Sequence, residues 1–228
     1  MLVHRAATVA AIASLMACGS TGEATDAGAP DSVDAATAER VVAAGIVEPD
    51  DLEGDWGDPG YDEAGEEVDD CLLGDDGTIA YAGSDVLGSD DDRGPTLVSV
   101  TVASETLVYP TTDAASAALE ALDEDVFAAC IESSVEGLDA VDVELLGGAA
   151  SGRAGGKAMM ATFDVDWGEG DDNTDAAELY ATQVGPALQL LWTTRSGEDH
   201  SDAVVDEPTI GIDKTVADLT GRVSAALG

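Results

Sequence analysis

A short apolar run near the N-terminus ends in the residues of this chain best suited to a defined modification chemistry: Leu15, Met16, Ala17 and Cys18. Arg5 precedes the run, and Ala6–Ala17 is too short to cross a bilayer as a helix. A positive residue, a short apolar stretch and small residues at a cleavage point are the parts of a secretory signal. The order of residues is that of a bacterial lipobox, which predicts removal of residues 1–17 and acylation of Cys18. The alternative is an ordinary secretory signal that contains a cysteine.

Acylation would anchor the exported chain at the outer face of the cell membrane, and several acyl chains hold far better than one. Residues 18–33 begin with Cys18 and continue with small, polar, Gly- and Pro-containing sequence. This composition predicts a flexible acidic linker. Residues 34–228 are then long enough, and apolar enough, to form a single domain with its own core.

Besides the acylated Cys18, two cysteines remain after removal of the signal peptide: Cys71 and Cys130. An even pair in an oxidising compartment predicts a disulfide. Closing a loop of about 60 residues would stabilise the fold by about 4 kcal/mol in the chain-entropy model. The alternatives are two buried thiols, or a zinc site; however, two cysteines and the distant His200 lack the spacing of a zinc ligand set.

A calcium-loop opening is the nearest match to a metal motif, with Asp171, Asn173 and Asp175 at alternate positions. Ala176 stands where such a loop needs glycine, and Thr182 where it needs the bidentate glutamate. An acidic turn is therefore the favoured interpretation, and we predict no metal ligands and no cofactor.

Catalytic motifs are weak throughout the chain. A Ser-His-Asp triad would have to use His200, which lies in a polar stretch, and no G-x-S-x-G elbow is present. The glycine-rich Gly147–Gly156 lacks the G-K-[ST] ending of a phosphate loop. Arg153 and Lys157, in or beside that segment, would meet either an anionic ligand or neighbouring carboxylates. The sequence thus predicts a protein that is not an enzyme, with a hydrolase as the less favoured alternative.

Charge is the second prominent property, because 48 acidic residues face only 8 lysines and arginines, for a formal net charge of −40. Such self-repulsion destabilises a compact state at low ionic strength. Salt shortens the Debye length from about 10 Å at 0.1 M to about 3 Å at 1 M, so we expect a salt-adapted protein with a hydrated acidic surface. A cation-binding or acidic partner surface is the alternative. Nucleic acid is excluded as a partner because the chain lacks a basic patch.

Hydrophobic periodicity predicts the elements of the first half. Asp34–Ala44 reads as a short helix that ends at Gly45, and Leu97–Tyr109 as one long strand or two short ones. Pro110 ends this strand, and Thr112 or Asp113 caps a helix that continues to about Ser133. The apolar face of this helix is expected to turn Cys130 inward.

The second half predicts strands followed by a helix. Val141–Leu146 and Lys157–Trp167 alternate in polarity, and Ala177–Val184 and Ala187–Thr194 form a hairpin around Gly185-Pro186. Ile212–Leu227 carries one apolar stripe and reads as the last helix. The expected fold class is α+β: an antiparallel sheet with helices packed on one face and one disulfide. Three tryptophans are expected to be core anchors rather than a binding platform: Trp56, Trp167 and Trp192.

The segment YPTTDAASAAL that opens the central helix, and the FAAC that ends at Cys130, resemble a known family. This family comprises sensor-like domains of actinobacterial cell-envelope lipoproteins, which are related to the extracellular domain of a receptor-type serine/threonine kinase. The hairpin Glu178–Thr194 and the helix after Ile212 are similar as well. The resemblance implies an α+β domain with a cleft for an extracytoplasmic ligand. Members often carry two disulfides, whereas this chain can form one.

The predicted function is therefore non-catalytic recognition by a membrane-anchored lipoprotein, with an unknown small molecule or envelope protein as partner. A carrier of an apolar or lipid ligand is the alternative. That function would need a large cavity lined by residues such as Met159, Met160, Leu190 and Trp192.

Overall fold

A computed structural model describes residues 30–57, 77–91, 98–134, 139–145, 156–166, 172–197 and 211–228 of the chain. The predicted signal peptide, Cys18, Cys71 and His200 lie outside these residues. The predictions that concern them are therefore neither confirmed nor corrected by the structure.

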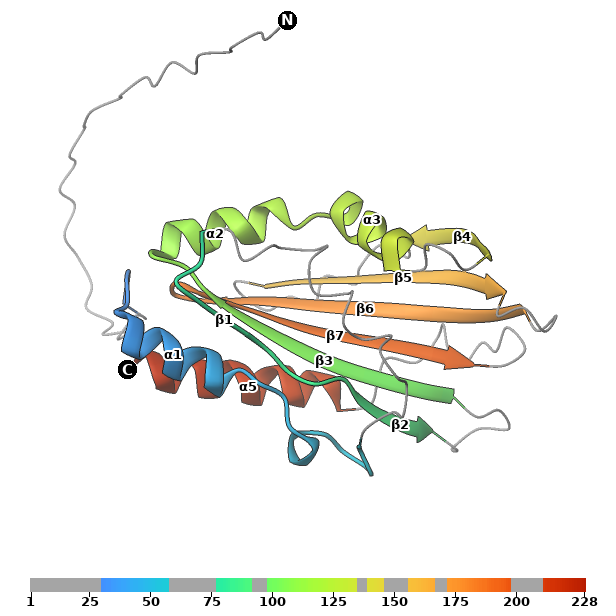
Figure 1. Cartoon of the computed structure of the whole chain (residues 1–228), viewed down its shortest axis with the longest axis horizontal. Helices are drawn as coiled ribbons and strands as arrows, with labels where there is room; N and C mark the ends of the chain where they lie inside the picture. Colours follow the sequence, from blue (N-terminus) through green and yellow to red (C-terminus); the bar gives the residue numbers. More distant parts are fainter. Residues whose placement is uncertain are drawn as a thin grey trace, which may run out of the picture.

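One seven-stranded antiparallel sheet forms the centre of the fold (Figure 1). The strand order is β1-β3-β7-β6-β5-β4, and β2 also pairs with β3. The strands are β1 (Ala80–Gly83), β2 (Leu87–Asp91), β3 (Val98–Val108), β4 (Asp139–Leu145), β5 (Gly156–Asp166), β6 (Asp172–Val184) and β7 (Ala187–Gly197). The helices are α1 (Ala35–Ala44), the one-turn η1 (Pro49–Asp51), α2 (Thr112–Ala121), α3 (Glu124–Ser134) and α5 (Ile212–Leu227). The α+β class and the antiparallel sheet are confirmed. None of the helices in these ranges combines the length and apolarity needed to cross a bilayer.

The helices cover both faces of the sheet, so the prediction that they pack on one face is wrong. Leu188 and Leu190 of β7 pack in one cluster with residues of α2 and α3. Ala187 and Leu191, on the opposite side of the same strand, pack with residues of α1 and α5. Successive side chains of a strand point to opposite faces, and β7 is apolar on both. We call the side of α2 and α3 face A and the side of α1 and α5 face B.

Two helices were predicted with nearly their observed bounds, α1 and α5. Asp34 is the N-cap of α1, where its carboxylate accepts a hydrogen bond from Thr37 N, and this bond holds the Asp34 pKa below its usual range. Gly45 ends the helix, and a Cβ there would collide with Thr106 Oγ1 of β3. The glycine is thus required by close approach of the helix end to the sheet.

The predicted central helix is two helices, because Leu122 and Asp123 interrupt it. Asp123 accepts a hydrogen bond from Val126 N through Oδ1 and so caps the start of α3. Lys157 of β5 donates to the carbonyls of Leu122 and Glu120, which satisfies the end of α2. Thr111, rather than Thr112 or Asp113, is the N-cap of α2. Local capping and one long-range lysine therefore outweigh the continuous helical periodicity.

The hairpin of β6 and β7 is confirmed and is longer than predicted. Val184 pairs with Ala187, and Gly185 between them adopts φ 55°, a conformation that favours glycine. β3 pairs with β7 along its whole length, from Val98 opposite Gly197 to Val108 opposite Ala187. These three long strands carry Glu105, Glu178, Trp192 and Arg195 of the candidate sites described next.

Candidate functional site

Of the three cysteines in the sequence, only Cys130 lies in the described residues. Cys130 of α3 points inward as predicted: it is 1% exposed and packs in the face A core with Phe127 and Ile131. Its pairing with Cys71 stays a prediction. His200, Arg153 and Trp167 also lie outside the described residues.

The calcium-loop interpretation is not supported, because Asn173 and Asp175 belong to β6 and not to a turn. Asn173 pairs with Val165 and Asp175 with Phe163 in a regular antiparallel ladder. The favoured acidic-turn interpretation is wrong for the same reason. Within the described ranges, no group of three or more His, Cys, Asp and Glu residues is arranged to hold a metal ion.

Lys157 has a structural contact in place of a ligand. Its Nζ lies 2.6 Å from the carbonyl oxygen of Leu122 and 3.2 Å from that of Glu120. Cations are favourable at a helix C-terminus, where unpaired carbonyls carry partial negative charge. This lysine thus ties β5 to the end of α2. From the sequence we expected it to contact an anionic ligand or neighbouring carboxylates, but the contacts described here are with backbone carbonyls.

The four residues proposed for an apolar carrier cavity do not line a common space. Met159, Leu190 and Trp192 lie on face A, where Met159 and Leu190 are buried in the core. Met160 lies on face B, with its sulfur 3.8 Å from Arg195 Nη2. Neighbouring residues of a strand necessarily point to opposite faces, so this prediction was wrong.

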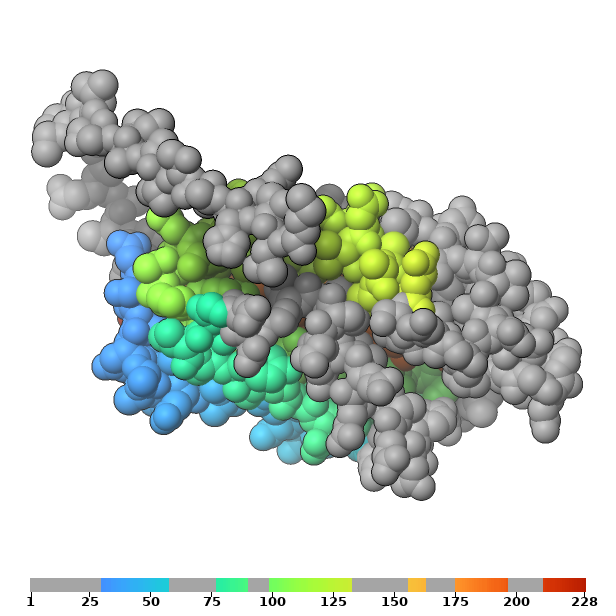
Figure 2. Space-filling view, turned by 45° about the horizontal axis from the view of Figure 1, so that its top comes forward, coloured from blue at the N-terminus to red at the C-terminus, as the bar shows by residue number. Residues whose placement is uncertain are grey.

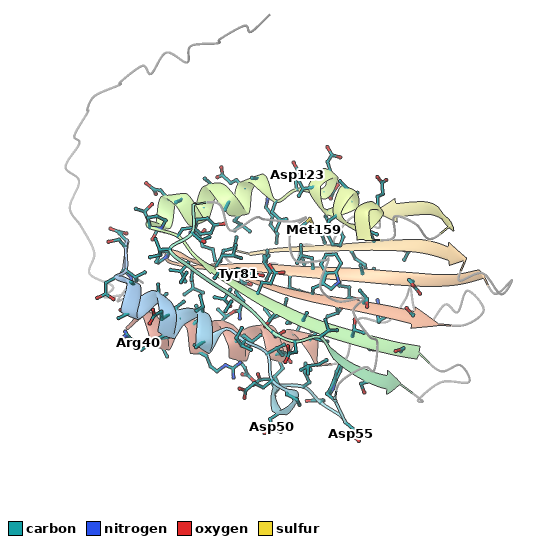
Figure 3. The ribbon with its side chains drawn as sticks, in the orientation of Figure 1. Arg40, Asp50, Asp55, Tyr81, Asp123 and Met159 are labelled. Carbon is teal, nitrogen blue, oxygen red and sulfur yellow. The ribbon has the colours of Figure 1, made fainter. Side chains whose placement is uncertain are left out.

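A partly accessible strip of face A runs from β7 to β1, and we call Trp192, Ala103, Glu105 and Tyr81 the recognition strip. Ala103 pairs with Trp192, and Leu107 pairs with Tyr81, so Glu105 lies between the two aromatic residues along β3. Strand spacings place the α-carbons of Trp192 and Tyr81 about 17 Å apart. The strip therefore has an aromatic side chain near each end and a carboxylate at its centre. Tyr81, at one end of the strip, is labelled in Figure 3.

Burial and ring packing distinguish the two aromatic residues of the strip. Tyr81 is 39% exposed, one of the two exposed large apolar residues in the described ranges. Trp192 is half-buried and packs edge-to-face on Phe127 of α3, with ring centroids 5.5 Å apart. Trp192 is thus the core anchor that the sequence predicted, with part of its surface left accessible.

Tyr81 and Glu105 were not singled out from the sequence, although β3 carries a signal for one of them. Its odd-numbered residues, Ser99 to Leu107, are mostly small or polar, and Glu105 stands among them. An acidic residue within the sequence of a central strand marks a face that is not fully covered. Tyr81 gives no comparable signal, because its strand is only four residues long.

Face B carries a second polar group, which is closed to solvent. Arg195 Nη2 donates to Glu178 Oε1 at 2.8 Å, and both side chains are 4% exposed. Tyr180 Oη and Thr193 Oγ1 donate to Glu178 Oε2 at 3.0 and 3.4 Å. Burial, followed by the negative charge of Glu178, raises the pKa of Tyr180 well above its usual range. An ion pair this deep in the sheet is a structural element and not an accessible site.

A strap, residues 46–57, crosses face B between α1 and β2. Its Trp56 packs against Val100 and Ala176, the residues that flank Arg195 in the sheet. Arg222 of α5 holds the strap through both carboxylate oxygens of Asp51, at 3.2 and 2.8 Å, and through the Ile46 carbonyl. The strap ends in the pair of hydrogen bonds between Gly57 and Gly88 of β2. Trp56 is therefore a core anchor, as predicted.

The comparisons with known proteins add little to this description. No family model matches the chain, and no curated protein matches it. One solved structure shows similarity: the crystal structure of LpqN, described as involved in cell envelope biogenesis of Mycobacterium tuberculosis. It is 11% identical, with a TM-score of 0.29, and the alignment covers 61% of this chain and 68% of that chain.

Proposed function

We propose that this chain is an exported lipoprotein, anchored through Cys18 at the outer face of the cell membrane. Its domain would be a non-catalytic, sensor-like module that binds a small ligand. The lipobox ending at Cys18 supports the anchor, and the linker that follows leads into a folded domain at Pro30. The anchoring is tested by the mass of the N-terminal peptide from membranes of an expressing bacterium. An acylated Cys18 supports it, and an unmodified cysteine overturns it.

The recognition strip is the observation that carries the proposal of ligand binding. Aromatic faces favour both apolar groups and cations, and Trp192 and Tyr81 flank the carboxylate of Glu105. The chain has a formal net charge of −40, which raises the local concentration of cations and repels anions. We therefore propose an amphipathic cation as the ligand: a molecule with an apolar body and one positive group.

Binding of a matched pair of detergents below micelle-forming concentrations tests the ligand class. Octyltrimethylammonium and octyl sulfate share an apolar chain and differ in the sign of the charge. We expect the cation to change the tryptophan fluorescence and the anion to leave it unchanged. Equal responses to both detergents would contradict the proposal, because they would show adsorption through the alkyl chain alone. The NaCl concentration is kept constant, at a value where the domain is folded.

Three variants assign the response to the strip. Glu105→Gln is expected to weaken binding of the cation about tenfold, equivalent to about 1.4 kcal/mol. Trp192→Phe should abolish the fluorescence response, while the matched Trp56→Phe variant keeps it, because Trp56 lies on the opposite face of the sheet. Unchanged affinity in Glu105→Gln, or a response lost in Trp56→Phe alone, would place the ligand elsewhere.

A further inference from the structure

The point at which the linker enters the domain is defined by hydrogen bonds to α2. Thr112 N donates to the Asp31 carbonyl at 2.9 Å, and Thr112 Oγ1 donates to the Pro30 carbonyl at 3.5 Å. Val33, two residues further, packs against the core cluster that contains Val108 and Leu227. The linker therefore joins the domain at the end that holds the N-termini of α1 and α2, the β6–β7 turn and the C-terminus of α5 (Figure 1). We call this the linker end.

The two ends of the sheet differ in charge. The strand residues that terminate at the linker end are uncharged: Ala80, Val108, Gly156, Val184 and Ala187. At the opposite end, four strands begin or end with aspartate: Asp91, Asp139, Asp166 and Asp172. Antiparallel registers align three of these, Asp139 opposite Asp166 and Asp166 opposite Asp172. The sheet thus has a strongly acidic end remote from the linker.

Three side-chain carboxylates at the linker end lie beside helix N-termini. Asp34 caps α1, Asp113 is in the first turn of α2, and Asp31 lies next to both. The partial positive charge of a helix N-terminus compensates nearby carboxylates in part. Within the described residues, neither of these two helix N-termini lies at the end of the sheet where β4 begins and β5 ends (Figure 1). Figure 2 shows α1 (blue) and α2 (green) together at one end of the molecule.

The length of the linker limits the distance from the membrane. Eleven residues lie between Cys18 and Pro30, and the twelve steps from one α-carbon to the next span at most about 43 Å when the chain is fully extended. We propose that the linker end faces the lipid surface, and that repulsion by anionic headgroups directs the acidic end of the sheet outward. This inference rests on the anchoring at Cys18 proposed above. It orients the sheet with its strands along the membrane normal, so that both faces are open to the sides.

Energy transfer from the acylated, full-length protein to acceptor-labelled headgroups of anionic vesicles tests this orientation. Ala217 and Ala225 offer a matched pair of donor sites, since both are exposed residues of α5, about 12 Å apart along the helix axis. A fluorescent amino acid is placed at one site at a time. We expect stronger loss of donor fluorescence at Ala225, which is nearer the linker end. Doubling the length of the linker should reduce the difference.

Each outcome has a distinct meaning. Equal transfer from the two sites, or stronger transfer from Ala217, in protein that co-sediments with the vesicles would overturn the orientation and leave the anchoring intact. Protein that does not co-sediment and carries an unmodified Cys18 would overturn the anchoring and the orientation together. A larger difference on anionic than on neutral vesicles supports the part assigned to headgroup repulsion, and an equal difference contradicts that part.

Discussion

Arg195 and Glu178 form an ion pair at 2.8 Å between neighbouring strands, with both side chains 4% exposed. Three side chains donate to the two oxygens of Glu178, so its negative charge is compensated within the sheet. Breaking a buried pair by removal of one partner leaves an uncompensated charge and costs about 3–5 kcal/mol. We expect Arg195→Met to lower the free energy of unfolding by this amount, measured by urea denaturation.

The double variant Arg195→Met/Glu178→Leu distinguishes the buried charge from simple loss of packing. Replacing both charged residues by apolar ones of similar volume is often close to neutral, so the double variant should recover most of the stability. A double variant as unstable as the sum of the single variants would contradict the assignment of the cost to an unpaired charge.

The bidentate pair of Arg222 and Asp51 predicts local rather than global loosening. Its side chains are 37% and 18% exposed, so solvent weakens the pair and the expected global cost is about 1 kcal/mol. Arg222→Lys loses the planar fork that contacts both Asp51 oxygens. We expect faster hydrogen exchange at Leu52 and Gly57 and unchanged exchange in α2 and α3. Uniformly faster exchange across the domain would show that the strap does not open independently.

The aspartates aligned across β4, β5 and β6 predict a stability that depends on salt. Like charges directly opposite each other in a sheet are destabilising, by roughly 0.2–1 kcal/mol per pair. Asp172→Asn should therefore raise the melting temperature at 0.1 M NaCl, and this gain should vanish at 2 M NaCl, where repulsion is screened. Asp85→Asn, at an exposed position between β1 and β2, is the control and should give a smaller gain. Equal gains in melting temperature for both variants would show that the gain comes from the lower net charge and not from the alignment of the aspartates.

Tyr180 predicts a loss of stability at alkaline pH. Burial keeps this phenol neutral in the folded state, whereas the unfolded chain ionises near its ordinary pKa of 10.0. The contribution of the neutral Tyr180 phenol to the free energy of unfolding is thus complete below pH 10 and is lost as the pH rises above this value. Tyr180→Phe removes the hydrogen bond to Glu178 and should cost about 1–3 kcal/mol at pH 7. Its unfolding free energy should then fall less steeply between pH 10 and 11.5 than that of the parent protein, and parallel curves would refute this role.

Much of the secondary structure was predictable, because its signals are local. Asp34 and Gly45 bracket α1, Gly185-Pro186 marks the turn of the hairpin, and the stripe of Ile212–Leu227 gives α5. The break between α2 and α3 was missed, although Asp123 is a capping residue. Apolar periodicity continues through Leu122, and the lysine that satisfies the end of α2 is 35 residues away in the chain.

Three features depend on the tertiary structure: the arrangement of the helices about the sheet, the buried ion pair of Arg195 and Glu178, and the recognition strip. The sequence ALQLLW places apolar residues on both faces of β7, but which helix covers which face follows from long-range packing. The recognition strip depends on two strand pairings, because β1 and β7 place Tyr81 and Trp192 on either side of Glu105 only through β3.

By itself, the sequence determined the acidic charge, the α+β class and the bounds of several elements, among them α1, β3 and α5, since these properties are carried by composition and by neighbouring residues. The lipobox at Cys18 stays a prediction. The tertiary structure alone decided that Arg195 meets Glu178, that Arg222 holds Asp51, and that Asp166 stands opposite Asp172. Strand register sets the pairs Arg195–Glu178 and Asp166–Asp172, and the docking of α5 sets the pair Arg222–Asp51. Both are outcomes of burying apolar surface over the whole domain, which no local sequence pattern encodes.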